Sequence, residues 1–150
     1  MKEYDEVSMQ AVPEKTADIH PRPVMIETRR GAVECAVSGE GPAVLLIHGA
    51  MGGYDQGLLL ARAAVGCSGF RFVAVSRPGY LATPLALGKT PEEQADLCAG
   101  VLDALDIRQA AVIAIEGGQH VSLFTHLHEI RMRVTQFLNT HAPLAAKPTG

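Results

Sequence analysis

Residues 111–118 read Ala-Val-Ile-Ala-Ile-Glu-Gly-Gly, an apolar run that stops at a glycine-rich turn with a carboxylate, Glu116, at its apex. A short apolar run bounded by turn residues is typical of a strand buried on both faces of a parallel sheet. We therefore predict a strand over 110–115, a sharp turn at Glu116 and a helix over 118–130. The apolar residues of that helix recur on one drifting stripe, at 121, 124, 127 and 130.

The rest of the chain repeats this alternation of strands and helices. Thr90, Pro91 and Glu93 form the signature of a helix start, with an N-cap, a proline at the first helical position and a capping-box glutamate. Strands that alternate with helices predict βαβ units and a mostly parallel α/β sheet with flanking helices, preceded here by an antiparallel hairpin. The full prediction is strands over 24–28, 32–37, 43–47, 72–75, 110–115 and 134–138, and helices over 54–65, 90–105 and 118–130.

Composition limits the size and setting of the protein. The chain has 150 residues, 47% of them hydrophobic, which is about one domain, and its net charge of −3 offers no basic face for nucleic acid or a membrane surface. Three cysteines without a CxxC pair indicate a reducing compartment. With no apolar run of membrane-spanning length and no signal peptide, we expect a cytoplasmic protein, in which 1–22 are a flexible leader, 23–143 the domain and 144–150 a tail.

Three loops at the carboxyl ends of the predicted strands carry recognisable motifs. In order they are His48-Gly49-Ala50-Met51-Gly52-Gly53, Ser76-Arg77-Pro78-Gly79-Tyr80 and Ala114-Ile115-Glu116-Gly117-Gly118. Their order and spacing resemble the α/β-hydrolase fold family, which has an HG-x-x-GG loop, an SRPGY-type loop and a strand-turn-helix elbow of pattern G-x-S-x-G. The resemblance runs from about residue 24 to residue 143, where residues 139–143 look like the end of the family's sixth strand. It implies a truncated α/β-hydrolase-like core.

The resemblance also implies roles for the loop residues. The N–H groups of Ala50 and Gly117 would form an oxyanion hole, with Met51 as the alternative donor if the register of the loop differs by one. His48, Gly49, Ser76 and Arg77 would support these loops, and Arg77 would bond the loop that begins at His48. The alternative interpretation is that these glycines only allow the chain to turn.

The chain departs from the family pattern at the positions of the catalytic residues. Glu116 occupies the position of the nucleophilic serine, so serine chemistry cannot occur there. A carboxylate at this apex has a parallel in the aspartate of dehalogenases and epoxide hydrolases, but the extra methylene of glutamate moves the attacking oxygen by about an ångström, which disfavours covalent catalysis. The acid and the histidine of the family's triad have no counterpart before Gly150. The candidate bases that remain are His120, His126, His128 and His141, of which His141, after a predicted strand, is the best placed.

Two classes of function follow. The first is a hydrolase relative, impaired or inactive as it stands, whose substrate would be a small ester-like molecule. The second is a non-catalytic binding or oligomerisation module, since the uncharged edge strand over 134–138 would favour self-association. A nucleotide-binding domain ranks last because the chain has neither a G-x-G-x-x-G array nor a P-loop lysine. We expect no cofactor and no metal, because His126 and His128 would point to opposite sides of a helix.

Overall fold

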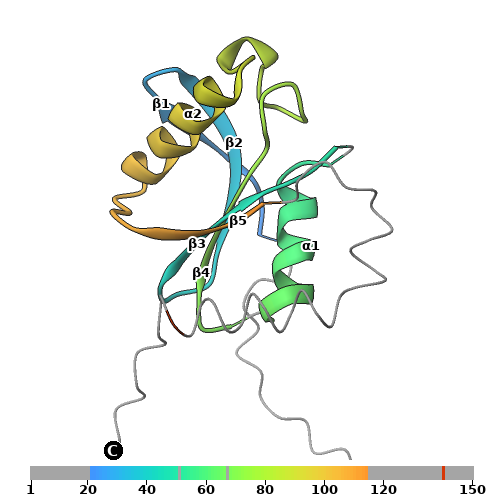
Figure 1. Cartoon of the computed structure of the whole chain (residues 1–150), viewed down its shortest axis with the longest axis vertical. Coiled ribbons are helices and arrows are strands. Elements are labelled where there is room, and N and C mark those ends of the chain that lie inside the picture. The colour runs from blue at the N-terminus through green and yellow to red at the C-terminus, as the bar shows by residue number, and fades with distance from the viewer. Residues whose placement is uncertain (1–20, 51, 67, 115–139, 141–150) are drawn as a thin grey trace, which may run out of the picture.

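The computed structural model describes residues 21–50, 52–66, 68–114 and 140. These residues form a five-stranded sheet, two α-helices and one short 3₁₀ turn (Figure 1). The strands are β1 (Val24–Thr28), β2 (Gly31–Ser38), β3 (Ala43–Ile47), β4 (Arg71–Val75) and β5 (Ala110–Ala114), and the helical elements are α1 (Tyr54–Val65), η1 (Leu85–Leu87) and α2 (Pro91–Ala104).

The sheet is mixed, with strand order β1-β2-β4-β3-β5. Strand β3 pairs in parallel with both β4 and β5, while β2 pairs antiparallel with both β1 and β4. The β1–β2 turn passes through Gly31, whose φ of 126° suits glycine, and Thr28 Oγ1 donates a hydrogen bond to the Gly31 carbonyl at 2.7 Å. The expected α/β architecture with its N-terminal antiparallel hairpin is therefore confirmed.

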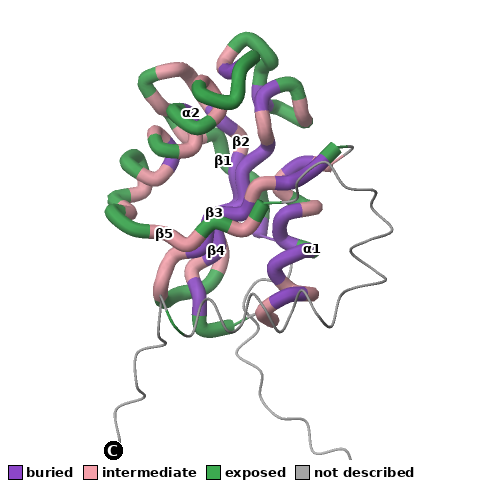
Figure 2. The backbone as a smooth tube through the Cα atoms, viewed as in Figure 1, coloured by how far each residue is buried: buried purple, intermediate pink, exposed green. Residues whose placement is uncertain are grey.

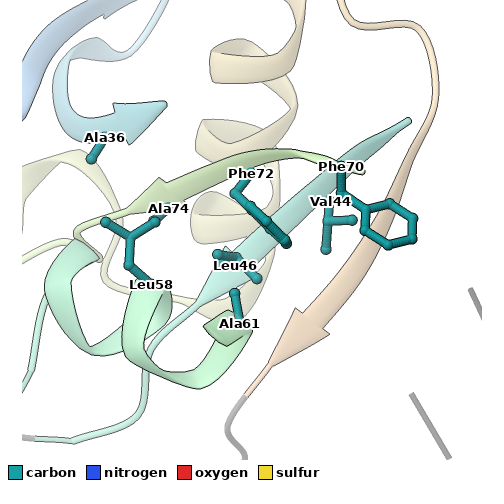
Figure 3. Packing of buried hydrophobic residues seen from close by; sticks show 8 residues of the cluster. All are labelled: Ala36, Val44, Leu46, Leu58, Ala61, Phe70, Phe72 and Ala74. Atoms are coloured by element: carbon teal, nitrogen blue, oxygen red, sulfur yellow. The ribbon is translucent and has the colours of Figure 1, made fainter. Parts of the chain in front are cut away.

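Alternation along the strands divides the core into two layers, one on each face of the sheet. Helix α1 covers one face and α2 the other (Figure 1). In Figure 3, Leu58 and Ala61 of α1 lie against strand side chains; the cluster comprises Ala36, Val44, Leu46, Leu58, Ala61, Phe70, Phe72 and Ala74. The cluster under α2 comprises Val33, Cys35, Leu45, Val73, Val75, Leu97 and Val101. Figure 2 shows that burial is concentrated in the central strands, whereas β5 has no buried residue.

Glycines set how closely the helices approach the sheet. A Cβ added at Gly57 of α1 would lie 3.2 Å from Leu46 Cβ of β3 and 3.5 Å from Ala74 Cβ of β4. A Cβ at Gly100 of α2 would lie 3.0 Å from Thr28 Cβ of β1. Gly57 thereby holds α1 against β3 and β4, whose ends carry two of the loop motifs, and Gly100 holds α2 against β1.

The predicted start of α2 is confirmed in detail. Thr90 Oγ1 accepts the Glu93 N–H at 3.3 Å, and Glu93 Oε2 accepts the Thr90 N–H at 3.2 Å, so the capping box is complete. Glu93 Oε2 also accepts the Lys89 N–H at 2.7 Å. These backbone bonds, from Lys89 and then Thr90, lower the pKa of Glu93 because they favour its charged form.

Several predicted features lie outside the described residues: the first 20 residues of the leader predicted over 1–22, the turn at Glu116, the helix over 118–130, the strand over 134–138 and the tail over 144–150. The domain limits at 23 and 143 stay predictions. None of the helices in the described part of the chain is long and apolar enough to cross a membrane.

Candidate functional site

The carboxyl ends of three neighbouring strands meet at one edge of the sheet. Ile47 at the end of β3 pairs with Val75 at the end of β4 and with Ala114 at the end of β5. The loops that begin at His48 and Ser76 therefore leave the sheet side by side, as the order of the motifs implied. The third motif leaves from Ala114, but beyond that residue it lies outside the described part of the chain.

His48 is fully buried, and both of its ring nitrogens contact backbone groups. Its Nδ1 lies 2.7 Å from the Gly49 carbonyl oxygen, and its Nε2 lies 2.9 Å from the Arg77 N–H nitrogen. Because a carbonyl can only accept and a backbone N–H can only donate, the ring is the neutral tautomer with its proton on Nδ1. Burial lowers the pKa of His48, which keeps the ring neutral. With both nitrogens engaged, His48 joins the two loops and cannot act as a general base.

Arg77 ties the same two loops to α2. Its Nη1 donates to the His48 carbonyl at 3.3 Å, and its Nε donates to Gln94 Oε1 on α2 at 3.2 Å. The guanidinium carbon lies 5.6 Å from the centre of the Tyr80 ring. The centres of the Tyr80 and His48 rings are 4.7 Å apart, and the two rings meet edge to face. The structure thus contains the bond from Arg77 to the His48 loop that the family resemblance implied.

Ser76 is also fully buried and links three parts of the fold. Its hydroxyl donates to Glu34 Oε2 of β2 at 2.8 Å and accepts the Tyr54 N–H of α1 at 3.1 Å. The N-cap residue of α1 is Gly53, which has no side chain, and a Cβ there would collide with Leu81. Ser76 therefore caps α1 from a neighbouring loop, in place of the N-cap side chain that most helices use.

The Gly49–Gly53 loop is held by two side chains from the first turn of α1. Gln56 Oε1 accepts the Gly49 N–H at 2.8 Å, and Asp55 Oδ1 accepts the Gly53 N–H at 3.1 Å. Ala50 is exposed beside this anchored backbone. Sequence reasoning missed Glu34 and Gln56, although glutamine at the third helical position is itself a sequence signal for bonding near a helix start.

A cavity of about 890 Å³ lies between α2 and the carboxyl-end half of the sheet. Its polar lining is His48, Ser76, Arg77 and Gln94, and most of the remaining lining is apolar. Its walls include Val33, Leu45, Ile47, Val75, Leu97, Val101, Leu102 and Val112. Residues 115–139 continue directly from its β5 wall and lie outside the described residues.

The described residues do not bring a catalytic pair together. His48 is the single histidine among them, and Ser76 bonds Glu34 rather than a histidine. The same part of the chain holds no cluster of three or more metal-ligating side chains. Met51, Glu116, Gly117 and His141, to which the sequence assigned roles, lie outside the described residues.

Comparisons with solved structures show the same fold in known proteins. An alpha/beta hydrolase fold protein from Nakamurella multipartita is 42% identical with a TM-score of 0.59, over 73% of this chain and 38% of that one. An epoxide hydrolase from an endophytic Streptomyces is 21% identical with a TM-score of 0.52, over 71% of this chain and 33% of that one. An esterase from Exiguobacterium antarcticum is 19% identical with a TM-score of 0.51, over 71% and 40%.

The chain therefore spans well under half the length of these structures. No family model matches it, and no curated protein matches it.

Proposed function

Because this chain carries part of an α/β-hydrolase fold, we propose that it is a hydrolase relative that keeps the oxyanion loop but is catalytically impaired or inactive. The observation that carries the proposal is the identity of residue 116. The sequence places a glutamate two residues after β5, where the family resemblance places the nucleophilic serine. A glutamate cannot supply the hydroxyl that acyl transfer by a serine requires.

The described residues support both parts of this proposal. The loop after β3 is anchored by His48, Gln56 and Asp55, an arrangement suited to holding backbone N–H groups in a fixed direction. Nucleophile activation needs a histidine with a free ring nitrogen, and neither nitrogen of His48 is free. These hydrogen bonds support an anion-stabilising loop, and the described residues contain no histidine that is free to act as a base.

The test is hydrolysis of p-nitrophenyl acetate by the full chain and by Glu116→Gln, which keeps the shape of the side chain and removes its charge. We expect both proteins to release p-nitrophenol at the rate of buffer alone. Glu40→Gln is the matched control, because it removes the same charge at an exposed residue of the β2–β3 turn. Turnover above background that is lost in Glu116→Gln and kept in Glu40→Gln would establish a working carboxylate and overturn the proposal.

The second candidate is a non-catalytic binding or oligomerisation module. One observation favours it: β5 is one of the two outer strands of the described sheet, and its Val112 is 55% exposed. Self-association through the predicted strand over 134–138 would be a further route, but that strand lies outside the described residues.

A further inference from the structure

Three successive peptide groups of the His48 loop are held by side chains. In the 48–49 peptide, the carbonyl accepts from Arg77 Nη1 at 3.3 Å and the N–H donates to Gln56 Oε1 at 2.8 Å. In the 49–50 peptide, the carbonyl accepts from His48 Nδ1 at 2.7 Å. In the 50–51 peptide, the carbonyl accepts from Gln56 Nε2 at 3.5 Å, at the limit of a hydrogen bond.

Of the Gly49 and Ala50 amides, only the Ala50 N–H is left open. No hydrogen bond joins it to another described residue, whereas the Gly49 N–H is occupied by Gln56. The described chain has no cis peptide, so the N–H and the carbonyl of the 49–50 peptide point in opposite directions. Since that carbonyl points at the buried His48 ring, the Ala50 N–H points away from it.

Gln56 contacts the loop on both sides of this open donor, through Gly49 and through Ala50 itself. It lies on the first turn of α1, so the position of its backbone is set by the helix and by the Ser76 cap. Gly52 makes room for its side chain: a Cβ at Gly52 would lie 2.6 Å from Gln56 Cβ. Gly52 and Gln56, four residues apart, therefore act together: the glycine leaves the space in which the glutamine side chain bonds Gly49 and Ala50.

We propose that Gln56 is a positioning residue, which orients the Gly49–Ala50 peptide so that the Ala50 N–H, and not the Gly49 N–H, is the anion-stabilising donor of this loop. The ligand class is the negatively charged oxygen of a tetrahedral acyl intermediate or of a small carboxylate. The proposal rests on the proposed function, because it treats residues 48–53 as an oxyanion loop.

The experiment measures amide hydrogen exchange in the ¹⁵N-labelled full chain by NMR. We expect the Gly49 amide to exchange slowly and the Ala50 amide to exchange close to the rate of an unprotected peptide. Gln56→Leu removes the acceptor and should accelerate Gly49 exchange about tenfold or more. Gln56→Glu keeps an oxygen acceptor and should restore slow exchange at Gly49, a rescue that a purely space-filling role of the side chain would not produce.

Gln109→Leu is the matched control, because it makes the same chemical change at an exposed residue before β5, and it should leave Gly49 exchange unchanged. Gly52→Ala provides an independent variant if Gln56→Leu does not fold, since it keeps Gln56 but displaces it and should also accelerate Gly49 exchange. Equal Gly49 exchange in the native chain and in the folded variants, or a slowly exchanging Ala50 amide, would overturn the proposal. Exchange requires no turnover, so this result is independent of the ester assay.

Discussion

His48 and Ser76 are polar side chains with no exposed surface, and each is fully satisfied by neighbouring groups. In the described part of the chain, no buried side-chain nitrogen or oxygen lacks a hydrogen-bond partner. An unpaired buried polar group costs about 1–3 kcal/mol, so this matching is a requirement for stability. At the scale of single residues, the site is a set of paired polar groups that fix two loops.

The buried neutral ring of His48 predicts that the protein loses stability in acid. Burial lowers the pKa of His48 from its usual 6.5, Arg77 lowers it further, and the Gly49 carbonyl and Asp55 oppose the shift. The unfolded chain therefore takes up this proton at a higher pH than the folded chain. The stabilisation is fully present above pH 6.5 and is lost as the pH falls from there through the lower folded pKa.

Urea unfolding of the native chain at about pH 7.5 and about pH 5.5 measures this loss. The control is His48→Gln, whose amide oxygen can still accept the Arg77 N–H but does not titrate. The variant should be less stable at neutral pH, and its free energy of unfolding should fall less in acid than that of the native chain. The other histidines of the chain contribute equally to both proteins, so identical pH dependences in the two would contradict the assignment.

At the scale of elements, α1 is the part on which the site depends most. Its first turn supplies Gln56 and Asp55 to the loop after β3, and its N-terminus is capped by Ser76 from the loop after β4. Gly57, one residue further along, gives α1 its close approach to β3 and β4. A change in the packing of α1 should therefore also disturb the loop after β3.

Gly57→Val tests that dependence. Two γ-methyl groups have no space between the helix and Leu46, so we expect destabilisation of about 1–3 kcal/mol and faster exchange of the Gly49 amide. Leu59→Val is the matched control, because it places valine in the same helix at a side chain that is 55% exposed; it should cost less than about 1 kcal/mol and leave Gly49 unaffected. Urea unfolding measures the loss of stability, and amide exchange measures the effect on Gly49. A Gly57→Val protein as stable as the control would show that α1 can move away from β3 and β4 without loss of stability.

At the scale of the whole molecule, regular patterns made the fold predictable. The apolar runs of β3 and β5 and the capping box of α2 each depend on neighbours in the sequence, and their positions agree with the structure within a residue or two. The hydrogen bonds of Glu34, Ser76 and Gln56 join residues up to 49 positions apart, and no local pattern encodes such pairs. Sequence motifs therefore indicated which loops meet but not which side chains anchor them.

The exposed face of β5 leads to the last prediction, which concerns assembly. Val112 is 55% exposed on β5, an outer strand of the described sheet, where an uncharged surface favours contact between molecules. Val112→Lys should lower the weight-average mass measured by sedimentation equilibrium, because a lysine on that strand must lose its hydration in any contact made there. Leu59→Lys introduces the same charge at an equally exposed residue of α1 and should leave the mass unchanged. A native chain that is already monomeric, or an equal effect of the two lysines, would exclude β5 as an association surface.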